Sequence, residues 1–112
     1  MQRTFIMTRL FDIQWKSIGL VDGDLATLQN RLKVNPDEGD LIQGTGGLRK
    51  TRIGLFSRGK RSGARVTYLD LPEYGIIYLL TVYAKNEKQD LARHEIIDFK
   101  SLVNEIKRAH MK

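Results

Sequence analysis

The sequence predicts an α+β fold: a small antiparallel sheet in the order β-α-α-β-β-β-α, with the helices packed on one face. Two observations support this prediction. Apolar residues recur at helical spacing near both ends of the chain, whereas its middle is rich in β-branched and aromatic residues interrupted by Gly, Ser and Pro. With 112 residues, 41% of them hydrophobic and 29% charged, the chain also suits one globular domain, which we expect to span residues 1–112.

One strand and two helices are expected in the N-terminal third. Residues 4–8 are apolar and β-branched, as in a short strand, and an amphipathic stretch follows with Phe11 and Trp15 four residues apart. We expect Trp15 to anchor the core. Leucines at helical spacing then indicate a second helix, which Asp22 or Asp24 can cap.

Three strands and a final helix are expected in the rest of the chain. Strands over 48–55, 64–71 and 75–84 are separated by Gly, Ser or Pro and should form a meander. The last of them is apolar on both faces, which is typical of a central strand covered by helices. A single apolar stripe then predicts the terminal helix. Its members are Ile96, Phe99, Val103 and Ile106.

The excess positive charge is confined to one segment. The chain has 19 basic and 13 acidic residues, but no Asp or Glu lies between Asp40 and Asp70. Seven basic residues lie there, which leaves 12 basic against 13 acidic residues elsewhere. Because like charges on one surface repel one another, this segment indicates a polyanionic partner, with nucleic acid as the first expectation. The seven are Arg49, Lys50, Arg52, Arg58, Lys60, Arg61 and Arg65.

Strand geometry sorts these side chains into faces. Lys50 and Arg52 share one face of their strand, whereas Arg49 points to the other. Arg65 can join the Lys50 face if the hairpin register allows it. An ordinary solvated surface would mix acids among the bases, so the cluster favours phosphate binding. Tyr83, at the end of the last strand, is either the final core aromatic or a ring that stacks on a nucleobase.

The other polar motifs indicate structural roles. The segment 43–47 is rich in glycine but lacks the spacing of a phosphate-binding loop, so we expect a turn. His94 and His110 are sixteen residues apart on the terminal helix, too far apart to form an acid/base pair, and surface or capping roles are expected. Without carboxylates in the basic segment we expect no metal or cofactor there, so any RNA cleavage would be metal-independent.

The sequence also indicates the cellular compartment of the protein. The chain has no cysteine, which excludes disulfides, thiolate nucleophiles and thiolate metal sites. The apolar run at the N-terminus is too short for a signal peptide, and no stretch approaches the roughly 18 residues of a membrane span. We therefore expect a cytoplasmic protein that does not associate with a membrane.

Three blocks of sequence carry a family resemblance. They read GDLIQGTGGLRKTR at 39–52, GKRSGAR at 59–65 and YLLTVYAKNE at 78–87. Taken together and in this order, they resemble the RelE/HigB family of type II toxin-antitoxin toxins, and the match extends over about 39–91. Over 1–38 the chain resembles the family only in its pattern of elements.

The resemblance implies a function and a set of partners. It implies a ribosome-dependent mRNA endonuclease, or mRNA interferase, which cleaves mRNA in the decoding site and inhibits translation. The implied partners are the ribosome with its mRNA and ribosomal RNA, and a cognate antitoxin of the helix-turn-helix DNA-binding type. Operator DNA would be reached only through the antitoxin complex.

The resemblance also implies a site built from Lys, Arg and Tyr. Attack of a ribose 2′-hydroxyl on its own phosphate needs proton removal, charge neutralisation and a proton for the leaving oxygen. Arginines suit the charge, and a lysine held among like charges could exchange a proton. Which side chain acts as the base stays open. Carried over by motif, the catalytic candidates are Lys50, Arg52, Lys60, Arg61, Arg65 and Tyr83, with Lys85 behind them as an RNA- or ribosome-binding candidate. Arg49 and Arg58 are expected to serve docking because of their place in the basic segment, and they complete the RNA- or ribosome-binding candidates.

Two other interpretations compete with the enzyme. The basic sheet face could belong to a non-catalytic RNA- or DNA-binding module, or to an interaction protein that mainly receives an acidic antitoxin segment. Separate substitution of Arg65 and Tyr83 distinguishes the first of these from a nuclease. A binding module should lose affinity in proportion to the charge removed, whereas a nuclease should lose cleavage with little change in ribosome binding.

Overall fold

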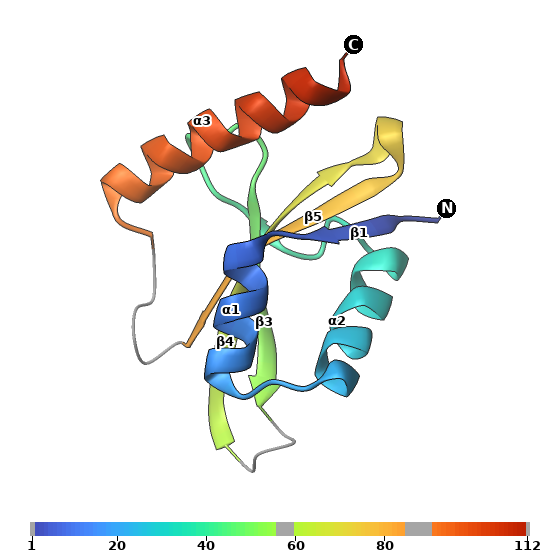
Figure 1. Cartoon of the computed structure of the whole chain (residues 1–112), viewed down its shortest axis with the longest axis vertical. Helices are drawn as coiled ribbons and strands as arrows, with labels where there is room; N and C mark the ends of the chain where they lie inside the picture. The colour runs from blue at the N-terminus through green and yellow to red at the C-terminus, as the bar shows by residue number, and fades with distance from the viewer. Residues whose placement is uncertain (1, 56–59, 85–90, 112) are drawn as a thin grey trace.

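The computed structural model describes residues 2–55, 60–84 and 91–111, without the side chains of 55 and 60–62. Within these residues the predicted order of elements is confirmed, and a two-residue strand, β2, is added before the meander. No helix in this part of the chain is long and apolar enough to span a membrane. The elements are β1 (Thr4–Met7), α1 (Arg9–Ile18), α2 (Asp22–Val34), β2 (Asp40–Leu41), β3 (Arg49–Leu55), β4 (Lys60–Leu71), the short 3₁₀ helix η2 (Pro72–Tyr74), β5 (Ile76–Ala84) and α3 (Arg93–His110) (Figure 1).

The sheet is mixed and has the strand order β1-β5-β4-β3-β2. Strands β3, β4 and β5 form the predicted antiparallel meander. Strand β1, however, pairs in parallel with β5, with Thr4 opposite Ile76, so the sheet is not purely antiparallel. Apolar periodicity identifies a strand but carries no information on the direction in which a distant strand pairs with it. The α+β class itself is confirmed.

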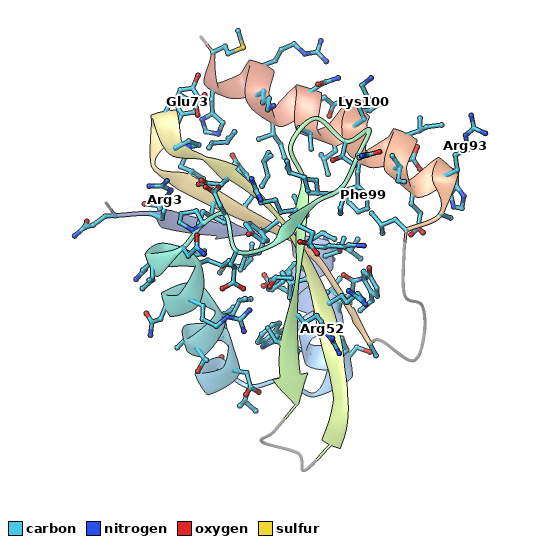
Figure 2. All side chains as sticks on the ribbon, turned by 180° about the vertical axis from the view of Figure 1, so that it is seen from behind. Arg3, Arg52, Glu73, Arg93, Phe99 and Lys100 are labelled. Atoms are coloured by element: carbon cyan, nitrogen blue, oxygen red, sulfur yellow. The ribbon has the colours of Figure 1, made fainter. Side chains whose placement is uncertain are left out.

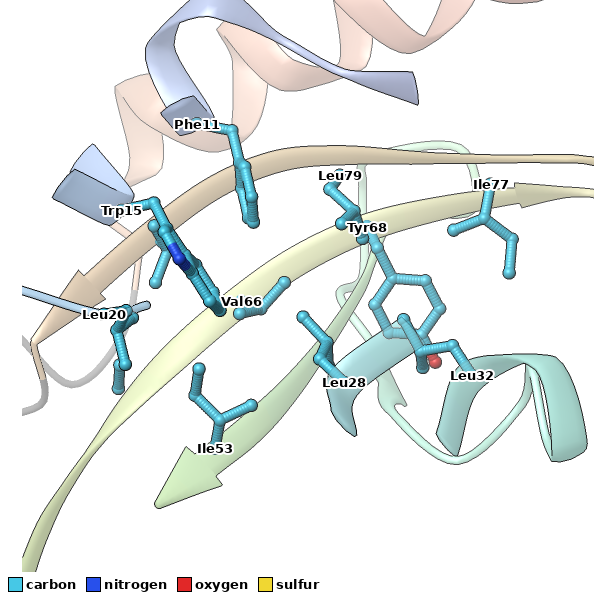
Figure 3. Packing of buried hydrophobic residues seen from close by; sticks show 12 residues of the cluster. Phe11, Trp15, Leu20, Leu28, Leu32, Ile53, Val66, Tyr68, Ile77 and Leu79 are labelled. Carbon is cyan, nitrogen blue, oxygen red and sulfur yellow. The ribbon is translucent and has the colours of Figure 1, made fainter. Parts of the chain in front are cut away.

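Helices α1 and α2 cover one face of the sheet. Phe11 and Trp15 of α1 stack with ring centroids 5.3 Å apart and pack with Leu28 and Leu32 of α2 against Tyr68 of β4 (Figure 3). Trp15 is only 5% exposed, which confirms its expected place as a core anchor. This core holds the three central strands from one side and leaves their other face to different neighbours.

Helix α3 packs on the opposite face, which corrects the expectation that all helices share one face. Successive strand residues point to opposite sides. Tyr68 therefore faces α1 and α2, whereas Leu69 faces α3 and meets Leu80 and Val103 there. The apolar character of β5 on both sides fits this arrangement. Figure 2 shows α3 across one end of this face and Arg52 toward the other end, beyond the helix.

One buried tyrosine fixes β2 at the edge of the sheet. The Tyr68 hydroxyl donates to the Pro36 carbonyl (2.7 Å) and accepts from the Gly39 amide (2.9 Å), and burial raises the pKa of this phenol. A Cβ at Gly39 would lie 2.7 Å from the Lys50 carbonyl oxygen, so only glycine allows this close approach. The α2–β2 connection is thereby held against β3.

Candidate functional site

Three candidate residues form one row across three strands. The pairing of β3 with β4 places Arg52 opposite Arg65, and the pairing of β4 with β5 places Arg65 opposite Tyr83. The Cβ atoms of residues opposite one another lie about 4.5–5.5 Å apart in such pairs. The register therefore brings Arg65 onto the face of Arg52, as the alternation of side chains allowed.

A second row lies beside the first. Lys50 is opposite Thr67, and Thr67 is opposite Thr81, with the two threonine hydroxyls hydrogen-bonded at 2.5 Å. Both rows lie on the α3 side, because Leu69 follows Thr67 by two residues and packs beneath α3. We call Lys50, Arg52 and Arg65 the basic patch.

The basic patch lines a hollow of about 210 Å³ that also contains acids. Its other lining residues are Glu38, Asp40 and Thr51. Asp40 is directly opposite Lys50 in the β2–β3 pair. Sequence reasoning missed Asp40, because a strand of two residues leaves no periodic signal. The segment between Asp40 and Asp70 is thus free of acids in sequence but not in space.

Among the described residues, the charges of Arg52 and Arg65 are poorly compensated. No ion pair within the described residues involves Arg52 or Arg65. The Nε atom of Arg65 is buried and has no hydrogen-bond partner among these residues. Like charges directly opposite one another on a sheet are destabilising, and a buried donor without an acceptor adds a desolvation cost. An anion in the hollow would offset both.

Tyr83 is buried beside Arg65. The side chain is only 5% exposed, and the residue lines a small pocket with Gln14 and Ile18 of α1. A ring so covered is not presented to stack on a base. Of the two alternatives for Tyr83, its burial favours the last core aromatic, placed opposite Arg65 in the β4–β5 pair.

Arg49 points to the opposite face, as alternation predicted. Its guanidinium donates to the carbonyl of Gly39 (2.7 Å) and lies 3.5 Å from the carboxylate of Asp37. These contacts tie β3 to the α2–β2 connection. The docking role proposed for Arg49 stays a prediction, and the structure gives the residue an architectural one.

The remaining basic candidates are only partly placed. Lys60 and Arg61, expected in the connection between strands, are the first two residues of β4, because β4 pairs with β3 as far as Leu55. The side chains of both, and the whole of Arg58 and Lys85, lie outside the described residues. Their contributions to the site stay predictions.

The histidines do not join the site. Both lie on α3, where the Nε2 atom of His110 is hydrogen-bonded to the Tyr78 hydroxyl (2.7 Å) and its ring stacks on Tyr74. The 43–47 segment is a turn, as expected, in which Thr45 Oγ1 donates to the Ile42 carbonyl. Among the described residues no group of three or more His, Cys, Asp or Glu side chains could hold a metal ion.

Comparison with solved structures identifies the fold. The chain is similar to the Escherichia coli toxin RelE, solved in the free state as a mutant with two arginines replaced by alanine, with a TM-score of 0.60 and 14% sequence identity. The alignment covers 90% of this chain and 96% of that one. No family model matches the sequence. The likeness shows a RelE-like α+β fold, which is the fold that the sequence resemblance implied.

Proposed function

We propose that this protein is the toxin of a type II toxin-antitoxin system and acts as a ribosome-dependent mRNA endonuclease. The RelE-like fold supports the class. The observation that carries the proposal is the facing pair Arg52 and Arg65, which lies beside Lys50 and has no ion pair among the described residues. Two guanidiniums held together in a hollow form a ready site for a phosphate.

The patch suits the charge of the proposed reaction. The ribose 2′-oxygen attacks the adjacent phosphorus and the bond to the 5′-oxygen breaks, which leaves a 2′,3′-cyclic phosphate. The 2′-hydroxyl gives its proton to solvent water, a weak base, and the 5′-oxygen gains a proton from a general acid. Arg52 and Arg65 would stabilise the extra negative charge on the phosphate in the transition state. Lys50, as an ammonium in the same hollow, would protonate the 5′-oxygen.

We propose that the reaction needs the ribosome because the described residues of the hollow offer no strong base for the proton of the 2′-hydroxyl. The Glu38 carboxylate, which lines the hollow, is already engaged by Arg31 and Thr51, and the hydrogen bond from Arg31 lowers its pKa. We propose that the ribosome aligns the mRNA and completes the site, so free RNA is cut negligibly. A helix-turn-helix antitoxin would neutralise the toxin, operator DNA would be bound only through that complex, and the compartment would be the cytoplasm.

The test is induced expression, followed by growth measurement and mapping of mRNA ends. Arg65→Gln should reduce cleavage by about 10²–10³-fold, the usual loss when one charge-stabilising group is removed. Arg108→Gln, which removes the same charge from the exposed side of α3, is the matched control. Purified protein should cut mRNA on ribosomes but not naked RNA. Unimpaired growth with soluble protein and intact transcripts would remove the assignment.

The burial of Tyr83 favours a second function, that of a module which binds RNA or DNA without cutting it. The Tyr83 side chain is only 5% exposed, which leaves little of the ring to stack on a base. For such a module, Arg65→Gln should lower the salt dependence of RNA affinity, by about 0.7 in log–log slope for each phosphate that is no longer neutralised. A nuclease would instead lose cleavage and keep most of its ribosome binding.

A further inference from the structure

A second hollow adjoins the basic patch. Its cavity volume is about 240 Å³, and four of its lining residues are aliphatic. We call it the apolar hollow, and it rests on the end of β2, the turn that follows β2, one residue of β3 and the start of α3. Its lining residues are Leu41, Ile42, Gln43, Lys50, Leu91 and Ile96.

We propose that the apolar hollow binds one nucleobase of the RNA whose phosphate lies on the basic patch, and that Gln43 reads the edge of this base. The proposal rests on the proposed function and adds a specificity site to it. It differs from a phosphate site, because Lys50 is the only charged side chain among the described residues that line the hollow.

Lys50 joins the two hollows. It lines the apolar hollow and also the hollow that contains Arg52 and Arg65. A lysine side chain is apolar along its stem and charged at its end. The two hollows therefore form one site with an apolar half and a cationic half, and the Lys50 side chain lies at the boundary between them. A nucleotide has the same division, because an uncharged ring is joined through the ribose to a phosphate.

The size and lining suit a base. A volume of about 240 Å³ is below the ~300–1,000 Å³ of pockets for drug-sized ligands, so a single small ring system fits better than a larger ligand. Leu41 is 58% exposed, which leaves an aliphatic surface open to cover a ring face. The edge of a base needs hydrogen bonds. Gln43 offers both a donor and an acceptor on one amide.

The turn that carries Gln43 is held firmly. The Ile42 amide donates to the Leu48 carbonyl (2.8 Å), and Thr45 Oγ1 accepts from the Leu48 amide (3.1 Å). From α3, Lys107 Nζ donates to the Gly46 carbonyl (2.6 Å). A reading group on such a turn is positioned before the ligand arrives, which is what discrimination between similar ligands requires.

The experiment maps cut sites in cells that express the full chain and tabulates the base at each position beside the cut. Gln43→Leu keeps the volume but removes the hydrogen bonds, so cutting should continue while the base preference at one flanking position weakens about 5- to 100-fold. Gln43→Glu, which only accepts, should shift that preference toward bases with an exocyclic amino group. Gln2→Leu, at an exposed position near the N-terminus, is the matched control.

Each outcome decides the proposal. Unchanged preference in both Gln43 variants, with cutting intact, would overturn the base subsite and leave the proposed nuclease standing. A Gln43→Leu protein that keeps its preference but escapes antitoxin neutralisation would assign the apolar hollow to a protein partner and also overturn the proposal. Absence of cuts by the unsubstituted chain would remove the proposed function and the subsite together.

Discussion

Arginines lie on both faces of strand β3, but their hydrogen-bond partners differ between the two faces. On the α2 side, Arg31 donates to the Glu38 carboxylate and to the Arg52 carbonyl, and Arg49 donates to the Gly39 carbonyl. On the α3 side, the side chain of Arg52 faces that of Arg65. Arg49 and Arg52, three positions apart in one strand, thus differ: Arg49 is bonded to the α2–β2 connection, whereas Arg52 faces another arginine.

This contrast shows why a count of basic residues cannot locate a site. All seven basic residues of the acid-free segment contribute equally to its net charge. What separates Arg49 from Arg52 and Arg65 is whether the described residues supply acceptors. The acceptors for Arg31 and Arg49 come from the α2–β2 connection at 37–39, which Tyr68 fixes against β3. A guanidinium satisfied in this way gains little from binding a phosphate, whereas the facing pair gains a great deal.

The largest expected effect comes from substituting the two faces separately. Arg52→Gln should reduce cleavage on ribosomes about 100-fold or more and change the free energy of unfolding by less than about 0.5 kcal/mol, because it removes a like-charge repulsion. Arg49→Gln should destabilise the fold by about 1–2 kcal/mol, because it loses its bond to the Gly39 carbonyl.

Denaturant unfolding and a ribosome cleavage assay on the same preparations measure both quantities. The comparison of faces is wrong if Arg49→Gln loses as much cleavage as Arg52→Gln while it stays fully folded. In that case Arg49 would serve docking, as its place in the basic segment indicated.

Patterns of adjacent residues predicted the contrast, because they depend only on local geometry. Side-chain alternation in a strand separated Arg49 from Lys50 and Arg52, and the apolar stripe of Ile96, Phe99 and Val103 predicted α3. The hydrophobic spacing around Trp15 likewise predicted its burial. Such signals repeat over several residues, and the structure confirms the features that they predicted.

What depends on distant pairing could not be predicted. Strand β2 has only two residues, so no sequence pattern indicated that Asp40 would pair with Lys50. The parallel pairing of β1 and the position of α3 on the second face depend on which strands meet. The place of Tyr83 opposite Arg65, and in a pocket with residues of α1 more than sixty positions earlier in the chain, likewise depends on distant pairing.

An intermediate effect on stability is expected at low pH on the α2 side of β3, where Arg31 pairs with Glu38. The hydrogen bond from Arg31 lowers the pKa of Glu38 below its ordinary 4.5, burial opposes this, and Thr51 adds a second hydrogen bond. A lowered pKa in the folded state means that the carboxylate stabilises the fold above the pKa of the unfolded chain, and that this stabilisation is lost as pH falls through the folded value. Glu38→Gln should therefore cost about 1 kcal/mol at pH 7, after screening by solvent, and less at pH 3.

Chemical unfolding of the wild type and of Glu38→Gln between pH 7 and pH 3 tests this directly. The two stability curves should converge on the acid side, with RNA cleavage at neutral pH nearly unchanged. A constant gap between the curves at every pH would mean that shape, and not charge, accounts for the contribution of Glu38.

The smallest effect concerns Asp40, the acid paired with Lys50 of the basic patch. Asp40 is opposite Lys50 and exposed, so it offsets part of the positive charge that a phosphate would meet. A cross-strand pair of opposite charges contributes roughly 0.2–1 kcal/mol, which predicts that Asp40→Asn raises affinity for a labelled oligouridine by up to about fivefold at low salt. The gain should shrink as salt screens the pair. Asp98→Asn, an exposed acid on α3, changes net charge equally and should have a smaller effect, so equal gains in both variants would show that Asp40 acts only through the overall charge of the protein.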